Sequence, residues 1–259
     1  MSVVLASLVL CGATPLRLGA ATVTFDTAPY WSTVSAVIGG MGPGQSSTFA
    51  QTFVAPAGPS VTLNDFSFYA ESYYPYNGGV ANLRLRAFVY AWSGSLTGNG
   101  GGAVGNPLYL SSSFSFSPPP RPNGWSPLTA NPGGSGLTLN PGQHYVLGFT
   151  LSDPGDFAAS FGDIEFQTVP ARDPNYSPAP IPRGVDFGSG GAVWLNNGNN
   201  FAALNTTVWD TWGDIGVIAF TAHFAVVPEP ASIVLVTLGA ACWRRRRPKQ
   251  PLTLAEGKP

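Results

Sequence analysis

Apolar and polar side chains alternate with a period of two along several stretches of the chain, which is the pattern of strands that bury one face. In residues 82–92 the apolar positions Leu83, Leu85, Ala87 and Val89 share one face, and Arg84 and Arg86 lie on the other. The other clear stretches, with the side chains that share a face, are 107–117 (Leu108, Leu110, Phe114, Phe116), 143–152 (Tyr145, Leu147, Phe149, Leu151) and 215–226 (Ile218, Phe220, Phe224, Val226). These stretches predict sheets with one buried and one solvent-facing side.

Weaker patterns extend this prediction over the middle of the chain, with further strands expected at residues 22–26, 46–54, 61–70, 136–139, 163–169 and 192–196. The chain has 32 glycines, 25 prolines and only 10% charged residues, so it is rich in turn formers and poor in material for helix surfaces. We therefore predict an all-β fold, a two-sheet antiparallel sandwich of the jelly-roll type. Within it, residues 137–147 predict a β-hairpin that turns at Pro141 and Gly142.

The C-terminal end departs from the strand pattern. Pro228, Glu229 and Pro230 precede an uncharged apolar run at residues 231–243, and Arg244, Arg245, Arg246 and Arg247 follow that run. The apolar run predicts a short hydrophobic helix, and the arginines favour the cytoplasmic side of a membrane. Residue types in this order resemble the PEP-CTERM sorting tail of Gram-negative bacteria.

The resemblance implies an exosortase, a transpeptidase that recognises such a tail and cuts near the Pro-Glu-Pro motif. It also implies transient insertion in the inner membrane, followed by delivery to the cell surface or the extracellular matrix. The apolar run has 13 residues, whereas a spanning helix needs about 20, which favours a transient signal over a permanent anchor. A protein that keeps its tail as a membrane anchor is the alternative.

The N-terminal end predicts a second membrane-directed segment, a signal peptide at residues 1–21 that signal peptidase removes. The sandwich is then expected at residues 22–226, the sorting tail at 227–249 and a polar extension at 250–259. Between residues 22 and 227, five arginines stand against eleven acidic residues, so the net charge there is near −6. Nucleic acid is therefore not expected as a partner. Cys11 and Cys242 lie in the terminal segments, so no disulfide is expected in the sandwich.

Catalytic chemistry has one candidate in the sequence. Asp163 and Glu165 lie on one face of a predicted strand, and a pair of carboxylates is what glycoside hydrolysis needs. An extracytoplasmic, carboxylate-dependent hydrolase is therefore the alternative function. Gln167 occupies the next position on that face, and His144 and His223 are expected on solvent-facing strand positions. We expect the carboxylates to lie on a solvated strand edge and predict no catalytic residue.

Aspartates gather in two places, Asp153 and Asp156 followed by Asp163, and Asp210 with Asp214. Calcium favours oxygen-rich loops, so a structural calcium ion is one interpretation, but neither group has the spacing of an EF-hand. Turn-forming aspartates are the alternative interpretation, because an Asp side chain accepts hydrogen bonds from nearby backbone N–H groups. We predict no dedicated metal site and no other cofactor.

Aromatic side chains give the strongest binding signal. The candidates for contact with a glycan are Tyr73, Tyr74, Tyr76, Trp194, Trp209 and Trp212. The apolar faces of sugar rings stack on aromatic rings, and neighbouring amides and carboxylates bond to the hydroxyls. We therefore predict an exported, non-enzymatic sandwich with a structural or adhesive role. Its expected partners are signal peptidase, an exosortase-type transpeptidase, the membrane during sorting, and exopolysaccharide.

Overall fold

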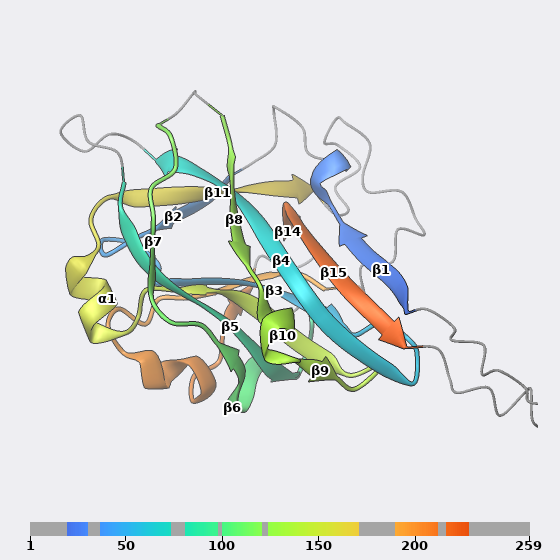
Figure 1. Cartoon of the computed structure of the whole chain (residues 1–259). Helices are drawn as coiled ribbons and strands as arrows, with labels where there is room; N and C mark the ends of the chain where they lie inside the picture. The colour runs from blue at the N-terminus through green and yellow to red at the C-terminus, as the bar shows by residue number, and fades with distance from the viewer. Residues whose placement is uncertain are drawn as a thin grey trace, which may run out of the picture.

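Two antiparallel sheets pack face to face around a core of aromatic and aliphatic side chains (Figure 1). The computed structural model describes residues 20–30, 37–73, 81–97, 100–120, 124–170, 190–211 and 216–227. Within these ranges every pairing between named strands is antiparallel. The predicted all-β, two-sheet antiparallel sandwich is confirmed. The predicted signal helix and the predicted C-terminal hydrophobic helix lie outside the described residues.

The first sheet has eight strands, with the order β1-β15-β4-β11-β14, β2 beside β11, and β8 and β9 beside β4. The strands are β1 (Ala21–Asp26), β2 (Val37–Met41), β4 (Ser60–Tyr73), β8 (Ser126–Ala130), β9 (Thr138–Leu139), β11 (Asp163–Pro170), β14 (Gly216–Ile218) and β15 (Phe220–Val227). With 14 residues, β4 is long enough to pair with four other strands. It is therefore the centre of this sheet.

The second sheet has seven strands, with the order β13-β12-β3-β10-β5-β6 and β7 beside β5. The strands are β3 (Thr48–Val54), β5 (Leu83–Ser93), β6 (Gly102–Leu110), β7 (Phe114–Phe116), β10 (His144–Thr150), β12 (Ala192–Leu195) and β13 (Asp210–Thr211). The helical pieces of the described chain are short: η1 (Ala28–Tyr30), η3 (Pro132–Ser135), α1 (Pro154–Ala159) and η4 (Phe201–Asn205). They lie in connections between strands, and η4 contributes the buried Ala203 and Leu204.

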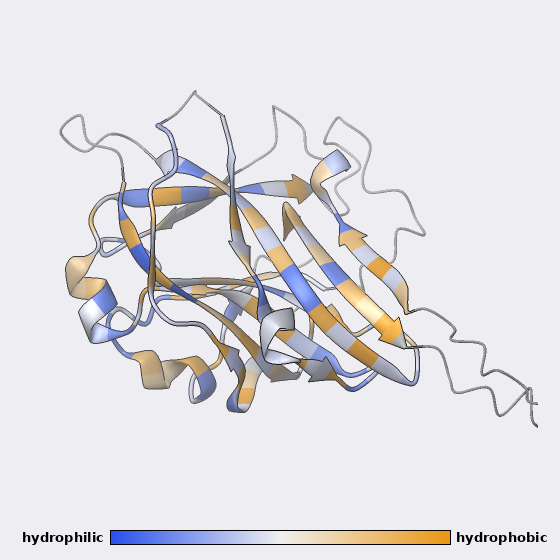
Figure 2. Cartoon of the chain, viewed as in Figure 1, coloured by the Kyte–Doolittle hydropathy of each residue, from blue (hydrophilic) through white to orange (hydrophobic). Residues whose placement is uncertain are grey.

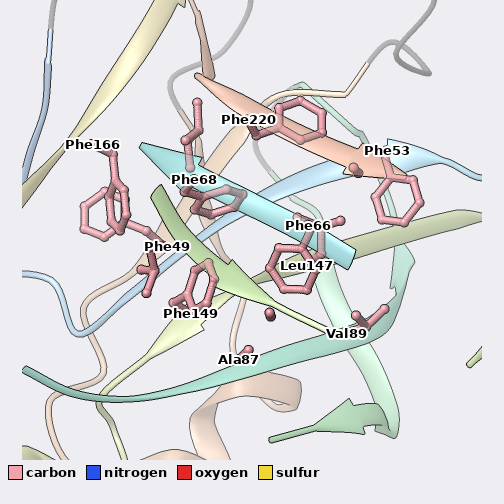
Figure 3. Packing of buried hydrophobic residues seen from close by; sticks show 14 of the residues in the cluster. Phe49, Phe53, Phe66, Phe68, Ala87, Val89, Leu147, Phe149, Phe166 and Phe220 are labelled. Carbon is pink, nitrogen blue, oxygen red and sulfur yellow. The ribbon is translucent and has the colours of Figure 1, made fainter. Parts of the chain in front are cut away.

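Figure 2 shows the period-two pattern as alternating bands along β4 and β15, and the apolar members of these strands join the core between the sheets. Phe66 and Phe68 of β4 both lie 5.3 Å, ring centre to ring centre, from Phe149 of β10 (Figure 3). All three rings are fully buried. Burial of such a side chain stabilises the fold by about 1.5–3 kcal/mol. The aromatic pairs between the two sheets therefore hold them in contact.

One predicted strand, residues 107–117, is divided in the structure. Leu108 and Leu110 belong to β6 and are 46% and 36% exposed, whereas Phe114 and Phe116 belong to β7 and pack against the core. The break lies at Ser111, whose N–H donates to the Ala87 carbonyl oxygen at 2.9 Å. The prediction that the four apolar residues share one buried face is therefore wrong. From Leu110, which pairs with Phe88, to Phe114, which pairs with Leu85, the segment has one residue more than β5, and this moves the later side chains to the other face.

The predicted hairpin at residues 137–147 is also wrong, although its turn forms. Gly142 has φ +72° at the expected position, a conformation that glycine adopts without steric cost. However, β9 pairs with β4 of the first sheet, while β10 pairs with β3 and β5 of the second. The turn therefore carries the chain from one sheet to the other. The Tyr145 hydroxyl fixes it by accepting a hydrogen bond from the Asn140 N–H at 2.8 Å.

A second hydrophobic cluster covers the outer face of the second sheet. Its aromatic members are Phe88, Tyr90 and Trp92 of β5 and Trp209, which precedes β13. The Trp209 ring lies 5.8 Å from the Trp92 ring and its Nε1 donates to the Leu204 carbonyl oxygen at 2.9 Å. The chain around η4 thus closes over this sheet. As a result β5 is buried on both faces along its second half, whereas the sequence predicted that one of its faces would be exposed to solvent.

Candidate functional site

The sandwich ends where the predicted sorting tail begins. β15 stops at Val227, and the Pro-Glu-Pro motif follows without a connecting residue. Val226 pairs with Ala21 of β1 and with Val61 of β4, and Val227 pairs with Ser60 of β4. We call Val226, Val227 and these three partners the sorting junction. Because both edges of β15 are paired there, the sheet holds the backbone up to the residue before the motif.

Side-chain packing also holds the end of β15. Val226 is 9% exposed, and a Cβ built on Gly58 would overlap its Cγ1 atom. Gly58 has φ +149°, which a residue with a side chain rarely adopts. The close approach of this glycine lets the turn before β4 pack on Val226. The sorting junction is therefore an ordered part of the sheet.

The first strand begins at the same place as the last one ends. β1 runs antiparallel to β15 over its whole length, from Ala21 opposite Val226 to Asp26 opposite Thr221 (Figure 1). Ala21 is also the last residue of the predicted signal peptide. The two predicted membrane-directed segments therefore adjoin the sandwich at one corner of the first sheet.

A group of carboxylates lies on the outer face of the first sheet, away from the core between the sheets. We call Glu71 of β4 with Asp163, Glu165 and Gln167 of β11 the acidic face. Glu165 stands opposite Glu71 in the strand pairing. Their exposed fractions are only 1% and 3%, and that of Asp163 is 7%. The expectation of a solvated strand edge for Asp163 and Glu165 is wrong, because β11 is an interior strand between β2 and β4.

Asp163 is a buried carboxylate of the acidic face. Burial raises the pKa of its carboxyl group above the ordinary value of 3.8. Among the residues that the structure describes, none donates a hydrogen bond to this carboxylate. Its side chain lies against Gly40 and Gly42, and a Cβ at Gly42 would overlap the Oδ1 atom. Two glycines of the β2 segment thus make room for a buried carboxylate.

The comparison with known protein families bears on the sorting junction. A family model described as the PEP-CTERM protein-sorting motif matches residues 226–247. The chain carries a PEP-CTERM sorting motif. This motif indicates export and processing by an exosortase, as the resemblance implied. The match begins inside β15, so the last two strand residues belong both to the sandwich and to the motif. No curated protein and no solved structure matches the chain.

Most residues of the PEP-CTERM motif lie outside the described part of the structure. This holds for Pro228, Glu229 and Pro230 and for the arginines Arg244, Arg245, Arg246 and Arg247. Within the described ranges, no helix has the length and apolar character that crossing a membrane requires.

The two predicted glycan contacts whose side chains the structure describes, Trp194 and Trp209, do not come together. Trp194 of β12 is partly buried and packs against the core between the sheets, whereas Trp209 lies in the second cluster on the other side of the same sheet. Trp209 is 2% exposed, so its ring offers no face to a sugar and its prediction as a glycan contact is wrong. Tyr73 ends β4, while Tyr74, Tyr76 and Trp212 lie outside the described residues.

The aspartates of the calcium hypothesis have separate roles. Asp153 caps α1, its carboxylate accepting from the Gly155 N–H at 3.1 Å. Asp156 is 4% exposed and accepts a hydrogen bond at 2.7 Å from the Arg86 guanidinium. No group of three potential metal ligands occurs in the described ranges. Asp210 is exposed on β13 and Asp214 lies outside the described part.

Both histidines lie where the strand pattern placed them. His144 is exposed at the start of β10, and the His223 side chain on β15 is 42% exposed. The His223 Nδ1 atom lies 2.6 Å from a carboxylate oxygen of Asp65.

Glu71 is the residue of the acidic face that sequence reasoning missed. The alternation of Tyr69, Glu71 and Tyr73 could have placed it on one face, but only the strand pairing sets it opposite Glu165.

Proposed function

We propose that this protein is a non-enzymatic structural or adhesive component of the cell surface or the exopolysaccharide matrix. The observation that carries this proposal is the direct junction between a closed sandwich and a PEP-CTERM motif. Release of the tail there delivers a rigid, net acidic domain with no linker of its own. A domain of this kind acts through its surface, and its persistence outside the cell depends on a well-packed core.

We further propose that its surface contacts glycans through the tyrosine-rich segment that β4 enters. In the pairing of β4 with β11, Tyr73 stands opposite Asp163, and Tyr74 and Tyr76 follow in the sequence. The segment therefore starts beside the acidic face, whose own side chains are buried and do not reach a sugar. The aromatic rings of the segment would supply the stacking contact that sugars need, and Asn77 in the same segment would supply an amide for the hydroxyls.

Substitution of Tyr74 tests the glycan contact. We expect Tyr74→Ala to weaken binding of the exported protein to exopolysaccharide from its own host by roughly tenfold, the loss of one stacking contact of about 1.4 kcal/mol. His144→Ala, which removes an exposed ring on the second sheet, is the control and should bind as the unmodified protein does. Equal binding by all three proteins, measured by co-sedimentation, would contradict the proposal.

The hydrolase alternative gains one specific observation, the pairing of Glu165 with Glu71. Side chains directly opposite on antiparallel strands have Cβ atoms about 4.5–5.5 Å apart, close to the roughly 5 Å between the carboxyl groups of retaining glycosidases. The near-complete burial of both glutamates argues against access by a polysaccharide. Polysaccharide turnover by the Glu165→Gln variant distinguishes the non-enzymatic function from the hydrolase. Turnover of a polysaccharide that this change abolishes in a folded protein would establish the enzyme.

A further inference from the structure

The PEP-CTERM motif continues directly from a strand that is paired on both edges. An enzyme that cuts a polypeptide holds it extended, through backbone hydrogen bonds like those of a sheet. At Val226 those backbone groups already serve the pairing with β1 and β4, and at Val227 they serve the pairing with β4. The folded sheet and a processing enzyme therefore compete for the same residues.

The two neighbours of β15 differ in how readily they can leave. β4 is the 14-residue centre of the first sheet, whereas β1 is a six-residue strand at its edge. In β1 only Phe25 is buried, and Ala21, Thr22 and Thr24 are exposed. Terminal edge strands with few buried side chains open at low free energy. Opening of β1 is thus the least costly way to free one edge of the sorting junction.

We propose that the pairing of β15 with β1 and β4 restricts the exosortase to peptide bonds beyond Val227, and that opening of β1 sets how fast the tail is removed. The proposal rests on the proposed function, because it takes the tail to be an exosortase substrate. In the cleavage, the acyl group before the cut passes to water or to an amine acceptor, and the amine of the tail leaves with a proton. The rate then follows the population in which the junction is open.

The register of β1 supplies a matched pair of variants. The Thr27 N–H donates to the Phe220 carbonyl oxygen at 2.9 Å. Because N–H groups alternate in direction along an antiparallel strand, the N–H of Val23 points toward β15 and that of Thr24 toward solvent. Proline at Val23 therefore removes a ladder hydrogen bond, while proline at Thr24 is tolerated at an edge. Insertion of Gly-Ser-Gly-Ser after Val227 is a third variant, which frees the motif without altering any strand.

The experiment follows the full-length precursor in a Gram-negative host that has an exosortase. Pulse-chase labelling gives the rate of tail loss, and mass spectrometry gives the mature C-terminus. We expect the insertion and Val23→Pro to accelerate tail loss several-fold, Thr24→Pro to leave it unchanged, and the unmodified protein to end at Val227 or beyond. The insertion result stands even where Val23→Pro impairs folding.

Two results would overturn the proposal: tail loss at one rate in the unmodified protein and the insertion variant, or a mature C-terminus upstream of Val227. Retention of residues 244–259 in every variant is a different result. It would contradict exosortase processing itself, and with it both the proposed function and the dependence on β1.

Discussion

The outer faces of the two sheets are built differently. The second sheet hides its outer face under an apolar cluster of Phe88, Tyr90, Trp92 and Trp209, which the chain around η4 completes. The first sheet presents polar groups there, with His223 beside Asp65 partly exposed and Glu71 and Glu165 buried. Both ends of the sandwich, at Ala21 and Val227, also belong to the first sheet.

From this difference we expect the second sheet to serve mainly the stability of the fold and the first sheet to serve recognition or processing. Where the second sheet is apolar on both faces, it can do little besides stabilise the fold. The partly exposed polar groups of the first sheet, such as His223 and Asp65, are available for recognition. Substitutions on the second sheet should therefore change the free energy of unfolding and leave sorting intact. Substitutions on the first sheet should affect pH dependence, binding or tail removal more than stability.

The largest expected effect is that of Trp209→Ala. Removing this buried ring leaves a cavity against Trp92 and Phe88 and should lower the free energy of unfolding by about 3–5 kcal/mol. Thr221→Ala, on the partly exposed face of β15, should change it by less than about 0.5 kcal/mol. Urea denaturation of the exported protein measures both. Similar losses for the two variants would show that the apolar cluster is not a supporting layer.

Arg86→Met tests the buried charge of the second sheet. Arg86 donates to the nearly buried Asp156 at 2.7 Å. Its loss leaves the Ser113 hydroxyl as a neutral donor to that carboxylate and should cost about 1–3 kcal/mol. The matched control is Arg84→Met. Arg84 lies 3.7 Å from Asp156 and its side chain is 45% exposed, so this change should cost less than about 1 kcal/mol. Equal costs, by denaturant titration, would mean that the short contact contributes nothing specific.

Asp163→Asn tests the corresponding carboxylate of the first sheet, for which we expect the opposite sign. Since the pKa of Asp163 is raised in the folded state, the folded form holds its proton more tightly than the unfolded one. Stability from this group is full below about pH 3.8 and is lost as the pH rises through the raised pKa.

The amide cannot ionise, so Asp163→Asn should raise the melting temperature at pH 7 relative to the unmodified protein. The gain should shrink as the pH falls toward 4. Asp156→Asn, which disrupts the pair with Arg86, should instead lower the melting temperature at pH 7. A gain for Asp163→Asn that is the same at every pH would exclude the buried charge as its cause.

The sequence was sufficient for the sandwich because its strands alternate, as Tyr145 to Leu151 do, and alternation is a local property. It was insufficient for the second cluster, because Phe88, Tyr90 and Trp92 interleave with the Leu83 to Val89 series and fill both faces of β5. The second face of β5 becomes buried only because Trp209, from a segment distant in the sequence, packs over it. Strand pairing also depends on residues that are distant in the sequence. The turn at Gly142 was predictable, but the sheets that its flanking strands join were not.

The candidate site likewise has a part that could be predicted from the sequence and a part that could not. The sorting motif is contiguous and was found from its residues alone. The acidic face is formed by two strands that are far apart in the sequence, so the sequence indicated Asp163 and Glu165 but not Glu71. The sequence pattern predicted a solvated edge for Asp163 and Glu165 for the same reason, since the strands that enclose β11 are set by tertiary pairing.

The smallest expected effect concerns β6, at the edge of the second sheet, where the sequence predicted a buried leucine. Leu108 is 46% exposed, so Leu108→Ala should lower the free energy of unfolding by less than about 1 kcal/mol. Leu147→Ala removes the same atoms from a fully buried position of β10 and should cost about 2–5 kcal/mol. The contrast, measured by urea denaturation, separates a leucine that merely follows the strand pattern from one that the fold encloses. A large loss for Leu108→Ala would mean that β6 is covered in solution, and the apolar support of the second sheet would then extend to its edge.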